Sequence, residues 1–372
     1  MKRILITGAN GFIGQNLDLA LRRIPEVEID HATSADSVAE LQGKAAEADF
    51  IFHLAGSNRP KAVEEFHRVN VGVTQAIVDA MLSNPSKRQT IVLASSIQAN
   101  ADNPYGNSKK LAEDTLAGLD CQDSKCVLVY RLPNVFGKWS RPNYNSVVAT
   151  FCHNIARDLP ITISAAEREL ELVYVDDVIA EWLRRLEGES VDESFCTVKP
   201  THRCTLGNLA ERIQAIHEMR RKLHVPDLSD PLNFALHATY TSFLDESDLA
   251  RCVDLKTDER GWLFEMTKSP AFGQVFVSTT KPGVVRGNHY HDSKIERFCL
   301  IQGSGIIRFR KVGTEKVIEY PVTDSNIQLV DIPPGYTHSI ENVGQADMVV
   351  LFWANEIFDP AAPDTHFEKV LF

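Results

Sequence analysis

Residues 7–14 have the sequence TGANGFIG, which gives Gly8, Gly11 and Gly14 a GxxGxxG spacing. A β-rich run, RILIT, precedes this stretch, and a helical pattern follows it. Glycines at this spacing let the backbone turn tightly and approach a pyrophosphate, which then lies at the positive N-terminus of the helix. The stretch therefore predicts the first strand, turn and helix of a dinucleotide-binding α/β domain.

The alternation of strand-like and helix-like segments continues to about residue 190. Further β-rich runs are VEIDHA, DFIFHLAG, QTIVLASS and KCVLVYRL, and helical patterns at residues 16–23, 71–83 and 107–118 lie between them. Because crossovers between parallel strands are right-handed, this order predicts a Rossmann-like doubly wound parallel sheet covered on both faces. One more amphipathic helix is expected at residues 205–223, capped by Thr205.

The pattern changes after about residue 250, where helical periodicity nearly vanishes. Short β-rich runs are separated there by the turns KPG, GSG, KVG, PPG and NVG. Many short strands between glycine and proline turns predict an antiparallel sandwich or barrel. We therefore expect an α/β domain at residues 1–245 and an all-β domain at residues 246–372.

The composition argues against several classes of function. The 372 residues include 50 acidic and 39 basic side chains, a formal net charge of −11. General nucleic-acid and membrane-surface binding both need a basic face, so neither is expected. The seven cysteines are scattered without a CxxC pair, which is typical of free thiols in a reducing compartment. No run approaches the ~18 apolar residues of a membrane span, and we expect a soluble, cytoplasmic protein.

Residues 95–110, with the sequence SSIQANADNPYGNSKK, carry a candidate catalytic set. Tyr105 and Lys109 are four positions apart and would share one face of a helix. The lysine charge is expected to lower the tyrosine pKa from about 10 and to grip the coenzyme ribose. Ser96 ends the preceding strand and is placed to bond the same carbonyl oxygen. A proton donor, a charge that tunes it and an orienting hydroxyl are what a ketone needs while a hydride reaches its carbon.

The choice of coenzyme depends on the end of the second predicted strand, which has the sequence IDHATS. An acid there would bond the ribose 2′-hydroxyl of NAD, and an arginine would accept the 2′-phosphate of NADP. Asp30 is at about the right distance, and no arginine follows it. Asp30 as a ribose ligand and Asp30 as an ordinary strand-end residue both stay open.

Four residues of the second half have the spacing of metal ligands. His289, His291 and Glu296 form an HxHxxxxE pattern, and PPGYTHSIEN supplies His338. Residues two apart on a strand point to the same side, so the first two histidines would face one interior. Three imidazoles and one carboxylate suit Zn²⁺, but also Fe, Mn or Ni. The pattern predicts a zinc or other divalent metal site.

Over roughly its first 240 residues the chain resembles the extended short-chain dehydrogenase/reductase family. The matching motifs are TGANGFIG, DFIFHLAG, NVGVT, SSIQA, YGNSK, RLPNVFG and YVDDV. The resemblance implies nucleotide-sugar chemistry with Ser96, Tyr105 and Lys109 as catalytic residues. The coenzyme-binding residues that it implies are Gly8, Asn10, Gly11, Phe12, Ile13, Gly14, Leu54, Ala55, Gly56, Tyr105 and Lys109.

The same resemblance implies substrate contacts. It places Arg131 and Asn134 of RLPNVFG beside the sugar nucleotide and the coenzyme. Family members often carry an arginine four residues before the tyrosine of YVDDV, where it holds the diphosphate. That position is Leu170 in this chain, and Arg168, two residues earlier, is the candidate diphosphate ligand.

Residues 255–372 resemble the cupin barrels through the two motifs that carry the predicted metal ligands. A cupin fold alone says little about the reaction. One alternative is a dimerisation module with a vestigial or structural metal. A second follows from DERGWLFE and VVRGNHYH, which are similar to the deoxysugar-epimerase branch of cupins. In that branch His289 would be a proton-abstracting base, and no metal would be bound.

The full chain resembles the CapF-like bifunctional enzymes of capsular polysaccharide and O-antigen synthesis. The matching segments are HLAGSNRP, SSIQANADNPYGNSK, GKWSRPNYNSVVATF, KPGVVRGNHYH, DIPPGYTHSIEN and IFDP. The resemblance implies a UDP-2-acetamido-2,6-dideoxy-4-hexulose that the cupin epimerises at C3 and the first domain reduces at C4. The implied product is UDP-2-acetamido-2,6-dideoxy-β-L-talose, on the route to UDP-N-acetyl-L-fucosamine. The resemblance further implies NADPH as coenzyme, zinc and a homodimer through the cupin. Because Ala32 stands where an arginine would accept the 2′-phosphate, NADH stays open as an alternative coenzyme.

Chemistry orders the two expected reactions. A proton beside a ketone is acidic because its charge spreads onto the oxygen, and a metal or hydrogen-bond donor stabilises that oxyanion. Reduction of the ketone abolishes this acidity, so epimerisation must come first. If the three histidines bind metal, the base is another residue, and Tyr336 and Lys294 are candidates. Two other hypotheses stay open: a single-function reductase with a dimerising cupin, and a non-catalytic dinucleotide or sugar sensor.

Overall fold

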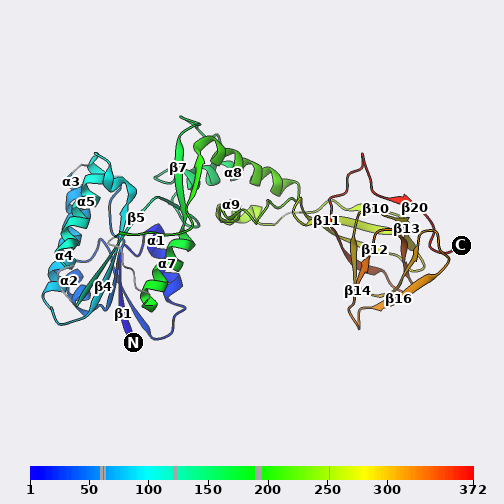
Figure 1. Ribbon diagram of the computed structural model, residues 1–372, viewed down its shortest axis with the longest axis horizontal. Coiled ribbons are helices and arrows are strands. Elements are labelled where there is room, and N and C mark those ends of the chain that lie inside the picture. The colour runs from blue at the N-terminus through cyan, green and yellow to red at the C-terminus, as the bar shows by residue number, and fades with distance from the viewer. Residues whose placement is uncertain (59–61, 63, 120–123, 189–194, 251) are drawn as a thin grey trace. The chain divides into compact units, whose positions relative to one another are not determined.

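The computed structural model describes residues 1–58, 62, 64–119, 124–188, 195–250 and 252–372. Part of the quoted segment HLAGSNRP, at residues 59–60, and Cys121 lie outside the described residues. The chain forms two compact units (Figure 1). The first comprises residues 1–213 and 235–244, and the second comprises residues 214–234 and 245–372.

A six-stranded parallel sheet forms the centre of the first unit, as the sequence predicts. Its strands, in spatial order, are β2 (Val27–Ala32), β1 (Lys2–Thr7), β3 (Phe50–His53), β4 (Gln89–Ser96), β5 (Lys125–Leu132) and β8 (Phe195–Cys196). Neighbouring strands pair in parallel throughout. The strand order reverses beside β1, and sheets of this kind bind ligands outside the carboxyl ends of the strands at such a reversal.

Helices cover both faces of this sheet. The helical segments of the unit are α1 (Phe12–Leu21), α2 (Val38–Glu47), α3 (Glu64–Phe66), η1 (His67–Gly72), α4 (Val73–Leu82), η2 (Ile97–Asn100), α5 (Pro104–Ala117), α6 (Val147–Ala156), α7 (Val175–Glu187), α8 (Leu206–Arg221) and α9 (Pro231–Thr241). The last part of α8 and the first four residues of α9 belong to the second unit. Leu17 and Trp182 pack α1 and α7 against one face. Leu41, Ile77 and Leu116 pack α2, α4 and α5 against the other (Figure 1).

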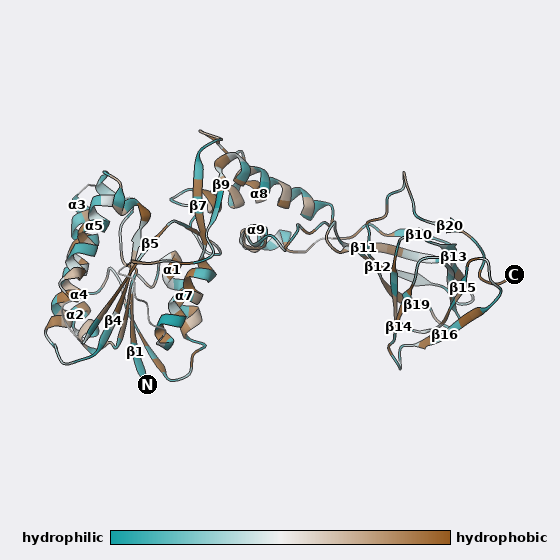
Figure 2. Ribbon diagram, viewed as in Figure 1, coloured by the Kyte–Doolittle hydropathy of each residue, from teal (hydrophilic) through white to brown (hydrophobic). Residues whose placement is uncertain are grey.

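The hydropathy pattern explains this layering. In Figure 2 the central strands are largely brown, whereas α7 alternates brown and teal. A strand covered on both faces is apolar throughout, and a helix with one buried stripe is not. The predicted cap of α8 is confirmed, because the Thr205 hydroxyl oxygen accepts a hydrogen bond of 3.1 Å from the Asn208 amide. No helix within the described residues has both the length and the apolar character needed to cross a membrane.

A small second sheet lies in the same unit. It joins β6 (Asn134–Phe136), β7 (Glu169–Tyr174) and β9 (His202–Thr205). Asn134 pairs in register with Leu172, and Glu171 pairs with Arg203. The sheet therefore brings the RLPNVFG motif together with residues that follow it by more than thirty positions.

The second unit consists of two antiparallel sheets with an apolar layer between them. The first has the order β10 (Lys256–Asp258), β11 (Gly261–Ser269), β12 (Gly273–Thr280), β19 (Met348–Ala354), β14 (Glu296–Gln302) and β17 (Leu329–Ile332). The second has the order β16 (Val317–Thr323), β15 (Ser304–Lys311), β18 (Tyr336–Asn342), β13 (Val285–Tyr290) and β20 (His366–Phe367). A short helix, η3 (Glu246–Asp248), precedes them. Phe298, Ile307, Ile340 and Phe352 are among the buried residues of the layer, and the predicted all-β architecture is confirmed.

Candidate functional site

The glycine turn lies at the carboxyl end of β1. Gly8 has a φ of +72°, and a β-carbon there would lie 2.8 Å from the Ala55 amide nitrogen, so a larger residue does not fit. Gly11 precedes α1 and has no side chain with which to cap the helix. The first amides of α1 are therefore left to an external acceptor, which is how a helix N-terminus binds a phosphate.

A cavity of about 1070 Å³ extends from this turn. Thirteen of the predicted site residues line it, namely Gly8, Asn10, Gly11, Phe12, Ile13, Gly14, Leu54, Gly56, Ser96, Tyr105, Lys109, Asn134 and Arg168. Its volume is at the upper end of the range for ligand sites, as a dinucleotide beside a sugar nucleotide requires. Two predicted residues, Ala55 and Arg131, are not part of the lining.

The three candidate catalytic residues meet where β4 is followed by η2 and α5. Ser96 ends β4, and Asn103 caps α5 by accepting a bond of 2.8 Å from the Gly106 amide. Burial raises the pKa of Tyr105, and its hydrogen bond with Ser96 acts in the opposite sense. The expected lowering of the tyrosine pKa by the lysine is therefore not what the structure shows. Desolvation of the phenolate is the larger effect.

Lys109 is buried beneath this cavity. Its ammonium group donates a hydrogen bond of 2.9 Å to the carbonyl oxygen of Ala94. Burial lowers the pKa of Lys109 to about 8, and the carboxylate of Glu113 opposes that shift. Because the side chain lines the cavity and bonds Ala94 of β4, it is placed to bond a ribose hydroxyl while it stays anchored to β4.

A buried polar network supports the loop after β3, and sequence reasoning did not identify it as a network. The Thr7 hydroxyl lies 2.8 Å from Nδ1 of His53 and accepts bonds from the Leu54 and Ala55 amides. Nε2 of His53 lies 2.8 Å from the Thr74 hydroxyl. Burial lowers the pKa of His53 to about 3, so the imidazole is neutral. The network fixes the loop that faces the glycine turn.

Arg131 is turned toward another helix. Its guanidinium group forms two-pronged bonds to Glu113, including one of 2.6 Å, and donates a bond of 2.7 Å to the Asn100 side chain. Its carbon CZ lies 4.1 Å from the centre of the Phe195 ring. The structure thus places Arg131 as an ion-pair partner of a buried carboxylate, outside the cavity lining.

The cavity lining also includes cationic and aromatic groups that the sequence analysis did not single out. Besides Arg168, it is lined by Arg141 and Arg203, and by Trp139 and Tyr144. Arg203 lies 3.5 Å from Glu171, across the small sheet. Several guanidinium groups in one cavity suit a diphosphate, because each presents a fork of donors. The segment GKWSRPNYN contained three of these residues, but only the fold adds Arg203.

Asp30 does not line the cavity. It belongs to β2 and pairs with Leu5 of β1. Ala32 lies two residues further along β2, and its carbonyl oxygen accepts a bond of 3.0 Å from the Gly8 amide. Of the two interpretations of Asp30, the geometry favours an ordinary strand residue. Ala32 is the residue of β2 that lies beside the glycine turn.

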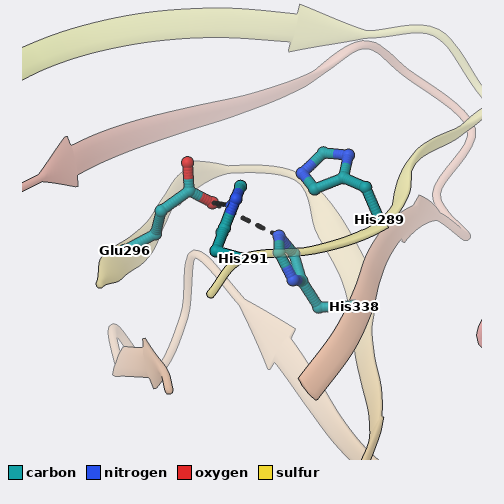
Figure 3. A group of neighbouring side chains, drawn as sticks. All are labelled: His289, His291, Glu296 and His338. Carbon is teal, nitrogen blue, oxygen red and sulfur yellow. Dashed lines mark ion pairs between the residues drawn. The ribbon is translucent and has the colours of Figure 1, made fainter. Parts of the chain in front are cut away.

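The four predicted metal ligands converge in the second unit (Figure 3). His289 belongs to β13 and His291 follows it, Glu296 begins β14, and His338 belongs to β18. One ligand atom from each residue lies within 4.8 Å of the others. Oε2 of Glu296 lies 3.3 Å from Nε2 of His338 and 3.5 Å from Nε2 of His291.

The chemistry of this donor set fits a divalent ion. Nε2 of His291 and of His338 are buried and have no hydrogen-bond partner among the described residues. Their Nδ1 atoms face carbonyl oxygens, those of Asp364 and Tyr336, which directs the Nε2 lone pairs inward. Burial lowers the pKa of His289 to about 4. Burial raises the pKa of Glu296, but contacts with the imidazoles outweigh it and the pKa is lowered.

The two candidate bases lie near this centre. The ammonium group of Lys294 is buried, 3.5 Å from a carboxylate oxygen of Glu356 and 3.5 Å from the carbonyl oxygen of Asp364. Tyr336 begins β18, two residues before His338, and its ring packs edge-on against Phe309. Neither arrangement assigns the proton transfer to one of them.

Comparison with known families matches both units. The NAD dependent epimerase/dehydratase family matches residues 4–193. The polysaccharide biosynthesis C-terminal domain matches residues 256–366.

Individual relatives match along the whole chain. A UDP-2-acetamido-2,6-beta-L-arabino-hexul-4-ose reductase of Pseudomonas aeruginosa is 43% identical over 365 residues, 98% of each chain. The crystal structure of the capsular polysaccharide assembling protein CapF from Staphylococcus aureus is 42% identical, with a TM-score of 0.90 over 99% of this chain and 100% of that chain. A UDP-glucuronic acid 4-epimerase of Bacillus cereus, 18% identical over 65% of this chain and 98% of its own, has a TM-score of 0.52 and shares the fold.

Proposed function

This chain belongs to the NAD dependent epimerase/dehydratase family, and from that premise we propose that it is a nucleotide-sugar 4-ketoreductase of polysaccharide synthesis that also epimerises its substrate. The observation that carries the proposal is the cavity in which Ser96, Tyr105 and Lys109 meet the glycine turn. The relative that is a 4-hexulose reductase covers the same residues at 43% identity.

In the proposed reduction, a bound nicotinamide coenzyme supplies the hydride to C4 of the sugar. The Tyr105 hydroxyl gives its proton to the C4 oxygen, and Ser96 orients that oxygen by a hydrogen bond. Lys109 holds the ribose and, when protonated, favours the phenolate that remains. The arginines of the cavity lining, Arg141, Arg168 and Arg203, would bind the diphosphate, with Asn134 beside the sugar.

NADPH is the proposed coenzyme, because the full-length resemblance implies it. Ala32, at the end of β2, has no charge for a 2′-phosphate, so NADH is the competing coenzyme. Titration of each coenzyme followed by fluorescence tests the choice. A dissociation constant for NADH more than tenfold below that for NADPH would reverse it.

The proposed epimerisation takes place in the cupin domain, for which we propose the bounds 246–372. A bound divalent ion, zinc by the resemblance, would supply a Lewis acid for charge that develops on an oxygen. His289, His291, Glu296 and His338 would hold it. Tyr336 or Lys294 would take the C3 proton, and its return to the opposite face would invert that carbon before reduction. We propose that the substrate is a UDP-2-acetamido-2,6-dideoxy-4-hexulose and the product the β-L-talose sugar.

A homodimer through the cupin is part of the proposal. The outward side of the sheet β12-β19-β14-β17 is apolar: Val275 pairs with Trp353, Val277 and Cys299 pair with Leu351, and Leu329 is 63% exposed. A sheet face in water is normally polar, so we infer that a second copy covers this one. Sedimentation of a Leu329→Lys, Leu351→Lys double variant should give monomers. A persistent dimer would reject this interface.

The test of function follows products by NMR after the 4-keto UDP-sugar is added in D₂O, with and without coenzyme and chelator. Without coenzyme, deuterium should enter at C3. Tyr105→Phe should abolish coenzyme oxidation and keep this exchange. A His289→Ala, His338→Ala variant should lose the exchange and keep coenzyme oxidation on pre-epimerised sugar. Absence of exchange in the wild type would leave a single-function reductase, and absence of coenzyme oxidation would leave a sensor.

The cellular setting is proposed on composition. The cysteines are scattered along the sequence without a CxxC pair, which is consistent with a reducing cytoplasm. The expectations that neither nucleic acid nor a membrane is a partner stay predictions.

A further inference from the structure

The segment 364–370 contacts the immediate neighbourhood of all three histidines of the candidate metal centre. We propose that this segment, called the strap below, positions these ligands, and that strap docking and metal binding are coupled. The inference rests on the proposed metal site and adds residues that lie outside it. Most of the strap follows residue 366, the last residue of the matched C-terminal domain.

The first contact is with His291. The carbonyl oxygen of Asp364 lies 2.5 Å from Nδ1 of His291. One carboxylate oxygen of Asp364 accepts a bond of 2.8 Å from the Asp292 amide, and the other accepts bonds of 2.9 Å from the Ser293 and Lys294 amides. Burial raises the pKa of the Asp364 carboxyl, but these amides outweigh it and the pKa is lowered. One side chain therefore anchors the loop that connects His291 to Glu296.

The second contact is with the backbone beside His289. Asn288 has a φ of +61°, and the pairing of β13 with β18 shifts register between Gly287 and His289. The Glu368 amide donates a bond of 3.0 Å to the Asn288 carbonyl oxygen, and the Val370 amide donates one of 3.2 Å to its side-chain oxygen. His289 also pairs with Phe367 of β20. The strap thus holds the left-handed residue that precedes a ligand.

The third contact is with the residue before His338. The Thr337 hydroxyl donates a hydrogen bond to the carbonyl oxygen of Glu368. Arg310, only 3% exposed, donates bonds to the carbonyl oxygens of Lys369 and Val370 at 2.8 and 3.1 Å and to the Glu368 carboxylate at 2.8 Å. A buried guanidinium group therefore ties the far end of the strap to β15, which pairs with the strand of His338.

These contacts matter because the ion pairs of Glu296 with His291 and His338, at 3.5 and 3.3 Å, do not fix the backbone that carries the histidines. Nε2 of His291 and Nε2 of His338 are buried without a hydrogen-bond partner among the described residues. Without metal, the centre therefore carries the free-energy cost of desolvating these two nitrogens. Ordering the three histidines before metal arrives lowers the entropy lost on binding. Removing a hydrogen-bond partner of a metal-bound imidazole typically lowers metal affinity by about 10- to 100-fold. Coupling between the strap and the metal is reciprocal by thermodynamic linkage.

Hydrogen–deuterium exchange of the wild-type chain tests this coupling without any substitution. The amides of Glu368 and Val370 should exchange about tenfold more slowly with Zn²⁺ than after chelation, within the usual range of coupling factors. The Trp262 amide, which donates a bond of 2.9 Å to the Thr279 hydroxyl in the other sheet, is the internal control. Equal exchange of the strap amides with bound Zn²⁺ and without it would overturn the inference.

Metal affinity of variants provides the second test, measured by competition with a chromophoric chelator. Asp364→Ala should weaken Zn²⁺ and Co²⁺ binding by about 10- to 100-fold and alter the visible absorption of the Co²⁺ form. Asp364→Asn keeps one acceptor oxygen and should restore part of the affinity. Asp324→Ala removes a comparable anchor, a carboxylate that accepts the Gly303 amide at 2.8 Å, and should leave affinity unchanged.

The outcomes separate the two proposals. If the wild type binds neither Zn²⁺ nor Co²⁺ at the four ligands, the metal site itself fails. If the wild type binds metal and Asp364→Ala binds it with the same affinity and spectrum, the metal site stands and the strap has no positioning role.

Discussion

A β-carbon on Gly106 would lie 2.1 Å from the carbonyl oxygen of Gln98, so helix α5 can approach η2 only because position 106 has no side chain. Tyr105 precedes this glycine, and Ser96 precedes η2. The close approach of the two segments is what brings the candidate acid to the end of β4.

Gly106→Ala should displace α5 and separate Tyr105 from Ser96. We expect kcat for ketone reduction to fall by about 100-fold, the usual effect of misplacing a catalytic group by roughly 1 Å. Coenzyme affinity should change less, because the glycine turn is untouched. Stopped-flow coenzyme oxidation measures the first quantity and fluorescence titration the second. Unchanged kcat would show that the approach of α5 does not set the geometry.

Lys109→Met tests the buried ammonium group. The pKa of Lys109 in the folded chain is about 8, below the 10.5 that is usual for a lysine, so the unfolded chain binds more protons between these pH values. Wild-type stability should therefore rise with pH from 8 to 10.5, by on the order of 3 kcal/mol. Lys109→Met should lack this rise, whereas Lys110→Met, at the exposed neighbour, should keep it. Urea unfolding across that pH range measures the slope, and parallel slopes would contradict the burial argument.

Glu113→Gln tests the pair formed with Arg131. Removing one charge of a buried ion pair costs about 3 kcal/mol or more, because the remaining charge is left unpaired. Since Glu113 also raises the pKa of Lys109, the pH-dependent rise in stability should begin at a lower pH than in the wild type. Asp114→Asn, at the adjacent exposed carboxylate, serves as the control. Equal loss of stability in both variants would remove the special role of the pair.

His338→Gln tests the candidate metal centre. The substitution removes one of two buried Nε2 atoms, so Zn²⁺ measured by elemental analysis should fall well below the wild-type content. Zn²⁺ at about 100 times its dissociation constant should stabilise the wild-type cupin unit by about 2.7 kcal/mol and the variant much less. His31→Gln changes a histidine of the first unit, paired with Asp18 and outside the four ligands, and should behave as the wild type. Full metal content in His338→Gln would reject the ligand set.

Arg203→Ala tests the arginines of the cavity lining. Because the proposed role of this guanidinium group is to bind the diphosphate and not to take part in hydride or proton transfer, its loss should raise KM for the UDP-sugar about tenfold with little change in kcat. Arg184→Ala, on the exposed side of α7 and bonded to Glu181, is the matched control. An equal fall of kcat and of kcat/KM would place Arg203 in the reaction step instead.

Much of the candidate site was predictable because its signals are local. Gly8, Gly11 and Gly14 follow a strand, Tyr105 and Lys109 are four positions apart on one helix, and two of the candidate ligand histidines are only two positions apart. Arg131 shows where such reasoning ends. Its motif matched the family, but its guanidinium group is bonded to Glu113, on a helix that the motif does not contain.

The sequence by itself determined the two folds, the candidate acid and the four candidate ligands, because periodicity and turn residues are properties of neighbouring positions. Only the tertiary structure decided the direction of the Tyr105 and Lys109 pKa shifts, the presence of Arg203 in the cavity lining and the contacts of Asp364 with the histidine loop. Desolvation and hydrogen bonds between distant residues arise only when the chain has folded, so no local pattern contains them.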